Sequence, residues 1–281
     1  MPSTISFDYR LPRWCRFFSQ QKSFTFVLPT PPSSSREVSD VAQFMQTEAT
    51  FFDLTLLEFI ASFAKPFGTY IDCGAHLGSH SVFFKAWLAD EVIAVEPNPY
   101  LCTLIQENIH QNKLPATDVV QAGLSDHESR MALIVPQDSK QEAGPNLAHA
   151  QLSMTPSPAD FVIGSVPVTS LDTLLSTRST RPVTLIKIDV ENHEAAVLRG
   201  AKHVLATDKP DLVIEIWTPE KKQKIDHFLS QWGYKSIAKF GKNSPSYYYK
   251  ALSSNPLIAH YQYTRYGLKR VLRKLIKTAV S

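Results

Sequence analysis

A regular alternation of short apolar runs with segments of helical periodicity constrains the fold of this chain more than any other feature. The apolar runs cover 69–73, 91–95, 118–122, 184–188 and 211–217. Segments with apolar residues on one helical face cover 50–64, 79–89, 98–112, 194–205 and 220–231. Such alternation predicts an α/β fold with a mostly parallel sheet, right-handed crossovers and helices on both faces.

The end of this region follows a different pattern. Two strand-like runs at 234–239 and 247–252 flank the turn sequence Lys242-Asn243-Ser244-Pro245, which is typical of a β-hairpin. The sheet is therefore expected to have seven strands and to end in an antiparallel hairpin.

We divide the chain into a leader (residues 1–45), a central domain (46–252) and a tail (253–281). The leader is expected to be irregular, with one short strand at 23–28 followed by a breaker rich in proline and serine. Within the domain, residues 136–165 include four prolines and show little periodicity, which predicts a long loop. This loop either covers the substrate side of the domain or is a disordered insertion.

Charge is distributed unevenly along the chain. There are 29 basic and 26 acidic residues, and the formal charge of +3 is too small to indicate nucleic-acid binding. The tail has six basic residues and no acidic one, so it carries +6 and leaves −3 for the rest of the chain. A helix over 267–279 would have one apolar and one basic face. That helix would either dock on the domain or bind an anionic membrane surface.

Cysteine usage and hydropathy indicate the cellular setting. The three cysteines include no CxxC pair, which argues against a disulfide framework and a zinc site. No secretory signal follows the N-terminal arginines, and no apolar run approaches the length of a membrane span. We expect a cytoplasmic protein, with the tail as the one segment suited to the inner membrane face.

A glycine-containing turn, D-x-G-x-x-x-G, follows the first strand and holds Asp72, Gly74 and Gly78. Compared with the dinucleotide pattern G-x-G-x-x-G, His76 and Ser79 stand where the second and third glycines belong. A pyrophosphate needs bare backbone at those points, so this turn is a poor NAD site.

S-adenosyl-L-methionine (SAM) fits the turn better, because it carries an adenosine without a phosphate. Glu96 ends the second strand, 24 residues after Asp72, where a carboxylate can accept the ribose hydroxyls. Asp72 would bind the ammonium of the cofactor, and the turn from Gly74 through His76 to Gly78 its carboxylate. In the alternative interpretation, Asp72 and Glu96 only cap the helices that follow them.

Three further residues complete the predicted cofactor site. Asn98 follows Glu96 at the start of a helix, and Ser125 and Asp126 follow the third strand. Because ligands bind at the carboxyl ends of strands in such sheets, Ser125 or Asp126 could reach the adenine edge. A plain β-turn explains these two residues equally well.

The strand at 184–188 leads into a dense group of ionisable residues. Asp189, Glu191, His193 and Glu194 lie within six residues. Charged groups at the end of a buried strand are costly unless they have partners, so this group indicates chemistry. Glu194 alone has a simpler explanation as a first-turn helix acid.

With these motifs the sequence resembles the FkbM family of SAM-dependent methyltransferases. The matching segments are 70–78 (YIDCGAHLG), 94–98 (AVEPN), 108–112 (NIHQN), 168–172 (VTSLD), 185–194 (LIKIDVENHE), 197–201 (VLRGA) and 210–215 (PDLVIE). The resemblance covers roughly 69–252 and implies a Rossmann-like class I methyltransferase fold. It departs from the family at Asn192, where a glycine is usual; Asn tolerates a left-handed backbone, so the turn can survive.

The resemblance implies methyl transfer from SAM, usually to a hydroxyl of a sugar, a glycan or a secondary metabolite. His193 is the preferred general base, because its ordinary pKa suits work near neutrality. Asp189 would face the methyl group and orient the acceptor, and Glu191 and Glu215 would hold acceptor hydroxyls. A divalent metal on these three carboxylates is a weaker alternative, and no metal is predicted. The competing hypothesis is a catalytically idle SAM-binding or scaffold domain that docks through its basic tail.

Overall fold

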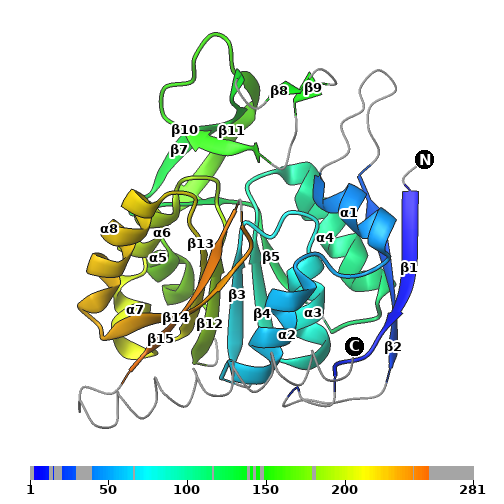
Figure 1. The fold of residues 1–281 in the computed structure, drawn as a ribbon. Coiled ribbons are helices and arrows are strands. Elements are labelled where there is room, and N and C mark those ends of the chain that lie inside the picture. The colour runs from blue at the N-terminus through cyan, green and yellow to red at the C-terminus, as the bar shows by residue number, and fades with distance from the viewer. Residues whose placement is uncertain are drawn as a thin grey trace.

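A seven-stranded sheet forms the centre of the molecule (Figure 1). The computed structural model describes residues 3–12, 15, 21–29, 40–65, 67–115, 117–137, 140–141, 144–145, 149–178, 182–242 and 244–252. The strand order is β14-β15-β13-β12-β3-β4-β5. Their bounds are β3 Thr69–Cys73, β4 Glu91–Val95, β5 Asp118–Val120, β12 Val183–Ile188, β13 Asp211–Glu215, β14 Tyr234–Phe240 and β15 Ser246–Ala251.

The sheet is mixed rather than uniformly parallel. β13, β12, β3, β4 and β5 pair in parallel, whereas β15 is antiparallel to both β13 and β14. The predicted α/β class, with strands alternating with helices and a hairpin closing the sheet, is therefore present. The parallel strands place their carboxyl ends at one edge, where ligands bind in such sheets.

Two hydrophobic clusters cover the two faces of the sheet. Alternate strand residues point to opposite faces, so Tyr70 belongs to one cluster and Ile71 to the other. The first cluster includes side chains of helices α2 (Leu54–Phe63), α3 (Ser79–Trp87) and α4 (Pro99–Gln111). The second includes α5 (Leu171–Ser176), α6 (Glu194–Arg199), α7 (Lys202–Thr207) and α8 (Pro219–Ser230).

The single helix expected at 194–205 is divided into α6 and α7. The chain turns at Gly200, where a Cβ atom would lie 2.1 Å from the Ser125 carbonyl oxygen. No side chain fits at that distance. The close approach explains why a glycine stands here.

The leader contributes to the first cluster. Strands β1 (Ser3–Tyr9) and β2 (Lys22–Leu28) pair antiparallel, and only the second was expected from the sequence. Phe24 stacks edge-on against Phe51 with ring centroids 4.8 Å apart. On α4, the Asn108 side chain accepts from the Val27 N–H (2.6 Å) and donates to the Val27 carbonyl (3.2 Å). These contacts attach the leader strands, and helix α1 (Asp40–Glu48) follows them.

The prediction of a loop at 136–165 is wrong for the second half of that range, which contains strands. β10 (Gln151–Ser153) and β11 (Phe161–Thr169) pair antiparallel with β7 (Ser129–Val135), and β11 also pairs with β6 (Gly123–Leu124). Two short strands, β8 (Lys140–Gln141) and β9 (Gly144–Pro145), lie between β7 and β10 in the sequence. We call the β7–β11 region the arm; it extends beyond the carboxyl edge of the main sheet (Figure 1). Its strands were not predicted, although the end of β11 alternates buried Val166 and Val168 with exposed Ser165 and Pro167. The prolines and glycine of this region obscured that two-residue pattern.

The predicted basic helix at 267–279 and the whole tail lie outside the described residues. Within the described part of the chain, every helix is too short or too polar to cross a bilayer.

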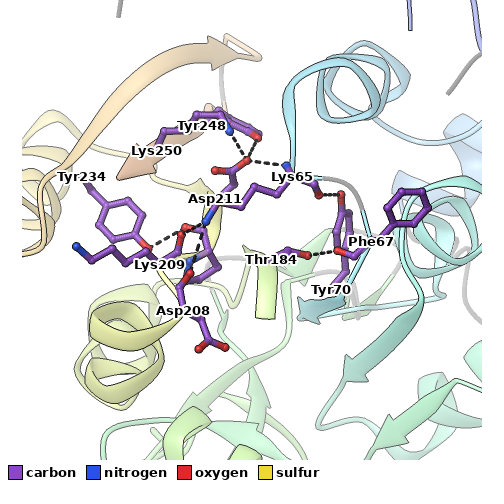
Figure 2. Close-up of polar contacts among 11 residues, drawn as sticks. Lys65, Phe67, Tyr70, Thr184, Asp208, Lys209, Asp211, Tyr234, Tyr248 and Lys250 are labelled. Carbon is purple, nitrogen blue, oxygen red and sulfur yellow. Dashed lines mark hydrogen bonds and ion pairs between the residues drawn. The ribbon is translucent and has the colours of Figure 1, made fainter. Parts of the chain in front are cut away.

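At the opposite edge of the sheet, a buried polar network joins distant segments (Figure 2). Asp211 is 1% exposed and accepts hydrogen bonds from Lys250 Nζ (2.5 Å), the Tyr248 hydroxyl (2.7 Å) and the Lys65 N–H (3.1 Å). Lys65 Nζ in turn donates to the Lys209 carbonyl at 2.7 Å. The network connects β13, β15 and the segment between α2 and β3.

We expect Lys250→Met to lower the free energy of unfolding by about 3–5 kcal/mol, because it leaves a buried carboxylate without its cation. Urea denaturation measures this change. Lys235→Met is the matched control, since Lys235 lies opposite Lys250 in the β14–β15 register but is exposed. Adding Asp211→Asn to Lys250→Met should restore part of the loss. Equal stability of both Lys→Met variants would contradict the role given to the ion pair.

Candidate functional site

A cavity of about 400 Å³ opens at the carboxyl ends of the parallel strands. Its polar lining includes Glu96, Asp189, Glu191 and Glu215. Its apolar lining comes from six elements and the segments beside them: Val41, Phe52, Val95, Pro97, Leu101, Ala122, Leu124, Leu133, Leu152 and Val190. The volume is typical of a small-molecule site.

The glycine turn after β3 forms the floor of this cavity. Gly74 has φ +75°, and a Cβ there would lie 1.8 Å from the Asp189 carbonyl oxygen. The turn thus touches the chain that leaves β12. Gly78 also has a left-handed backbone (φ +82°), and its Cβ would press against Ile105 of α4. Both predicted glycines are therefore required by close approach, and Gly74 and His76 line the cavity.

Glu96 is held at the end of β4 by two backbone donors. Its Oε2 accepts from the His76 N–H and its Oε1 from the Asn98 N–H, both at 2.9 Å. Each oxygen keeps a further lone pair for a ligand. Burial raises the pKa of Glu96 to about 7, although the two N–H groups oppose the shift. This is the placement that the sequence predicted for a carboxylate facing a ribose.

Asp72 does not face the cavity. Its side chain is fully buried, accepts from the Ser81 hydroxyl at 2.6 Å and lies 3.2 Å from Lys187 Nζ. Asp72 is therefore not placed to contact a cofactor ammonium, as was predicted. It can act on the cavity only through Lys187. Lys187 Nζ also donates to the Gly74 carbonyl (3.1 Å) and lies 3.3 Å from Asp189 Oδ2. Burial lowers the pKa of Lys187, but the two carboxylates outweigh it and the net shift is upward.

Three carboxyl groups meet at the other end of the cavity. Asp189, Glu191 and Glu215 each have an oxygen within 4.8 Å of the others. Burial, then the charges of Asp189 and Glu215, raises the pKa of Glu191 to about 9. Burial and Asp189 raise the pKa of Glu215 to about 8. Burial also tends to raise the pKa of Asp189, but the charge of Lys187 and hydrogen bonds outweigh it, so the net shift of this pKa is downward.

The backbone that presents these groups is left-handed at two successive residues. Glu191 has φ 50° and Asn192 has φ 74°. The Asn192 N–H donates to Glu194 Oε1 at 2.9 Å, and the Asn192 side chain accepts from Lys221 Nζ. The Asn that replaces the usual glycine thus adopts the backbone that was expected of it.

Four other predicted residues do not line the cavity. His193 Nε2 is 3.1 Å from the Ser125 hydroxyl, and neither residue lines the cavity. Burial lowers the pKa of His193. Asp126 bonds to the His127 ring and to Arg199 Nε, both at 2.7 Å, and these bonds hold its pKa well below the usual range. Asn98 caps α4 by accepting from the Tyr100 N–H at 3.0 Å.

Several lining residues were not predicted from the sequence. Trp217 and Ser244 both donate to the Glu215 carboxylate, Trp217 through Nε1 at 2.7 Å. Lys187, which is buried in β12 and lies beside Asp189, was not predicted as a site residue either, although a lysine inside an apolar strand that leads to Asp189 was a usable signal. Asp40 of α1 and the arm residues His149 and Gln151 also line the cavity. Nothing in their local sequence indicated this.

The alternating strands and helices define the chain as an α/β protein, and its cavity lies at the carboxyl edge of the sheet, where such folds bind ligands. A family model described as "Methyltransferase FkbM domain" matches residues 72–236, more than half of the chain. The chain belongs to this family of methyltransferases.

Solved structures give a weaker likeness. A methyltransferase FkbM from Methylobacillus flagellatus KT is 17% identical over 72% of this chain and 49% of its own, with a TM-score of 0.46. The chain thus spans about half the length of that protein. An rRNA methylase from Streptococcus thermophilus is 11% identical over 71% and 95% of the two chains, with a TM-score of 0.44. A search of curated proteins found no match.

The free energy of unfolding of the ligand-free protein should fall as pH rises from about 7 to about 8.5. In this range the unfolded chain has already lost the protons of Glu191 and Glu215. The folded protein still binds part of them, because its pKa values are about 9 and about 8. The folded state thus binds more protons, and stability decreases with pH. Urea denaturation in the presence of a chelator measures the slope.

The double variant Glu191→Gln/Glu215→Gln should show a flatter pH dependence. The exposed Glu128→Gln is the matched control and should keep the wild-type slope. A double variant with an unchanged slope would show that these carboxyl groups are not the source of the effect.

Proposed function

We propose that the protein transfers the methyl group of SAM to a hydroxyl of a sugar, a glycan or a secondary metabolite. One observation carries the proposal: a single cavity connects Glu96, at the end of β4, with the three carboxyl groups at the ends of β12 and β13. The end with Glu96 suits the adenosine of SAM. The end with the three carboxyl groups suits the methyl group of SAM and the acceptor hydroxyl.

The residues of the cavity fit the cofactor. Glu96 has free lone pairs for the ribose hydroxyls, and the apolar wall of Pro97, Leu101 and Leu152 suits the adenine ring. The carboxylate of Asp189, whose pKa is shifted downward, suits a sulfonium cation, since opposite charges attract. When bound, SAM supplies an electrophilic methyl group. Membership of the methyltransferase family agrees with this fit.

A hydroxyl acceptor fits the remaining space. Trp217 is 40% exposed and lines the cavity beside Glu215, so a sugar ring could stack on the indole while carboxyl oxygens accept its hydroxyl protons. At neutral pH, the raised pKa values leave Glu191 and Glu215 mostly protonated. They can then donate to an acceptor as well as accept from it. We infer that these two groups orient the acceptor next to Asp189.

The proton of the acceptor hydroxyl must leave as the new bond forms. His193 was the base predicted from sequence, but it bonds to the Ser125 hydroxyl and does not line the cavity. Glu191 lines the cavity, and its pKa of about 9 makes its ionised form a stronger base than an ordinary carboxylate. We therefore propose Glu191 as the proton acceptor. His193 would only help to position the 189–194 segment, through its bond to Ser125. The same three carboxyl groups could instead hold a divalent cation through oxygen ligands.

Glu96→Ala should weaken SAM binding by about 1–3 kcal/mol, as expected when charge-assisted hydrogen bonds are lost. Asp72→Ala should weaken it as well, but through release of Lys187 rather than through a lost contact. Isothermal titration calorimetry measures both, with Glu128→Gln as the control. Wild-type affinity in the Glu96 variant would remove the basis for the adenosine site.

Glu191→Gln should lower kcat by roughly 10²–10⁴ while leaving SAM affinity nearly unchanged. The wild-type rate should rise with pH between about 7 and 9, because the base must lose its proton, and the variant should lose this rise. Turnover is followed with labelled cofactor on pools of glycans and small molecules.

His193→Ala is the companion variant, and it should cost less than Glu191→Gln. If instead His193→Ala abolishes turnover and Glu191→Gln does not, the base is His193, as the sequence suggested. Cofactor binding without turnover on any pool would favour the idle scaffold.

A further inference from the structure

The cavity is lined by many carboxyl groups and by no basic side chain of its own. Its five acidic residues are Asp40, Glu96, Asp189, Glu191 and Glu215. Among the described residues, no lysine or arginine lines it. An anionic acceptor, such as a uronic acid or a sugar phosphate, would therefore meet charges of its own sign, which disfavours binding. The lining favours a neutral or a cationic acceptor.

The cations at hand do not balance these groups. Lys187 Nζ lies 3.3 Å from Asp189 Oδ2, and the sulfonium of SAM accounts for one further positive charge. Burial and the neighbouring carboxylates raise the pKa of Glu191 to about 9 and that of Glu215 to about 8. A second positive charge in the cavity would favour the ionised form of Glu191. That form is the one that the proposed proton transfer requires.

An exposed indole lies beside the carboxyl groups. Trp217 is 40% exposed, and its Nε1 donates to Glu215 at 2.7 Å, which fixes the ring. The His149 ring stands edge-on to it, at 83° with centroids 6.4 Å apart. Asp40 Oδ2 lies 4.0 Å from His149 Nε2, too far for a hydrogen bond, so this carboxylate keeps its lone pairs. An aromatic face next to a carboxylate is suited to a protonated amine.

We propose that the methyl acceptor carries a protonated amine near the hydroxyl that is methylated, as in an amino sugar or an aminocyclitol. The amine contacts the Trp217 ring and the Asp40 carboxylate, and the hydroxyl faces Glu191. The inference rests on the proposed function and narrows its acceptor class. The methyl group still goes to the hydroxyl oxygen and the hydroxyl proton to Glu191. The amine only holds the acceptor, because a protonated nitrogen has no lone pair with which to attack.

Chemical N-acetylation tests the proposal before the acceptor is identified. Pools of glycans and small molecules that include amino sugars are assayed with labelled SAM before and after treatment with acetic anhydride in aqueous bicarbonate. This reagent acetylates amines and leaves most hydroxyls free, and the same pools with acetate alone are the control. We expect transfer to fall about tenfold or more after treatment, because an amide carries no charge to bind the ring and the carboxylate.

Two substitutions locate the amine. Asp40→Asn and Trp217→Leu should each lower the initial rate at low acceptor concentration about fivefold. Trp217→Phe keeps a ring and should lie between wild type and Trp217→Leu. Affinity for S-adenosylhomocysteine, measured by calorimetry, should stay within about twofold of wild type and reports that each variant is folded. Glu48→Gln, exposed on α1 and outside the cavity, is the matched control and should keep the wild-type rate.

Two results would overturn the amine subsite and leave the proposed methyl transfer standing. One is undiminished transfer to the acetylated pools. The other is a wild-type rate in both Asp40→Asn and Trp217→Leu. Two further results reach the proposed function itself. Label on nitrogen rather than oxygen, located by mass spectrometry of the product, would make the amine the nucleophile. Absence of transfer to every pool by a protein that binds S-adenosylhomocysteine would overturn both proposals.

Discussion

The site depends on one buried cation. Lys187 Nζ lies between Asp72 and Asp189 and donates to the carbonyl of Gly74. It thereby connects the strand that carries the glycine turn with the strand that leads to the carboxyl groups. Without it, the fully buried carboxylate of Asp72 would lie without a cation and would take up a proton. The ion pairs therefore set the position and the ionisation of Asp189.

The charge of Lys187 influences the ionisation of all three clustered carboxyl groups, first Asp189 and through it Glu191 and Glu215. Lys187 keeps Asp189 ionised, and the charge of Asp189 in turn helps to raise the pKa of Glu191 and Glu215. Carboxyl groups a few ångströms apart are thus driven to different protonation states, an arrangement that active sites use to separate acid from base. Trp217 and Ser244 hold Glu215 in place. The cluster can then donate and accept protons at one pH.

Much of the fold could be predicted because its central strands are buried on both faces. β3 and β4 were predicted to the residue, since each is a short apolar run with clear limits. β1, β10 and β11 were not predicted as strands. β10 has only three residues, whereas β1 alternates Ile5, Phe7 and Tyr9 with polar residues, a strand pattern that was missed in the leader. In the site, sequence placed Gly74, Glu96 and Asp189 at the correct edge. It could not give side-chain depth at Asp72, which is fully buried against Lys187, or at His193, which bonds to Ser125 and does not line the cavity. His76, which was expected to bind the cofactor, does line the cavity.

Three residues of the cavity lie outside the segments that resemble the family motifs. Asp40 comes from α1, His149 from the arm and Trp217 from the segment after β13. These three meet: His149 Nε2 lies 4.0 Å from Asp40 Oδ2, and its ring centroid lies 6.4 Å from that of Trp217. The motifs 70–78 and 185–194 contribute other lining residues, among them Gly74, His76 and Asp189. For the methyl transfer proposed above, we propose that the ring–carboxylate group of Asp40, His149 and Trp217 selects the acceptor, because its members come together only in the folded chain.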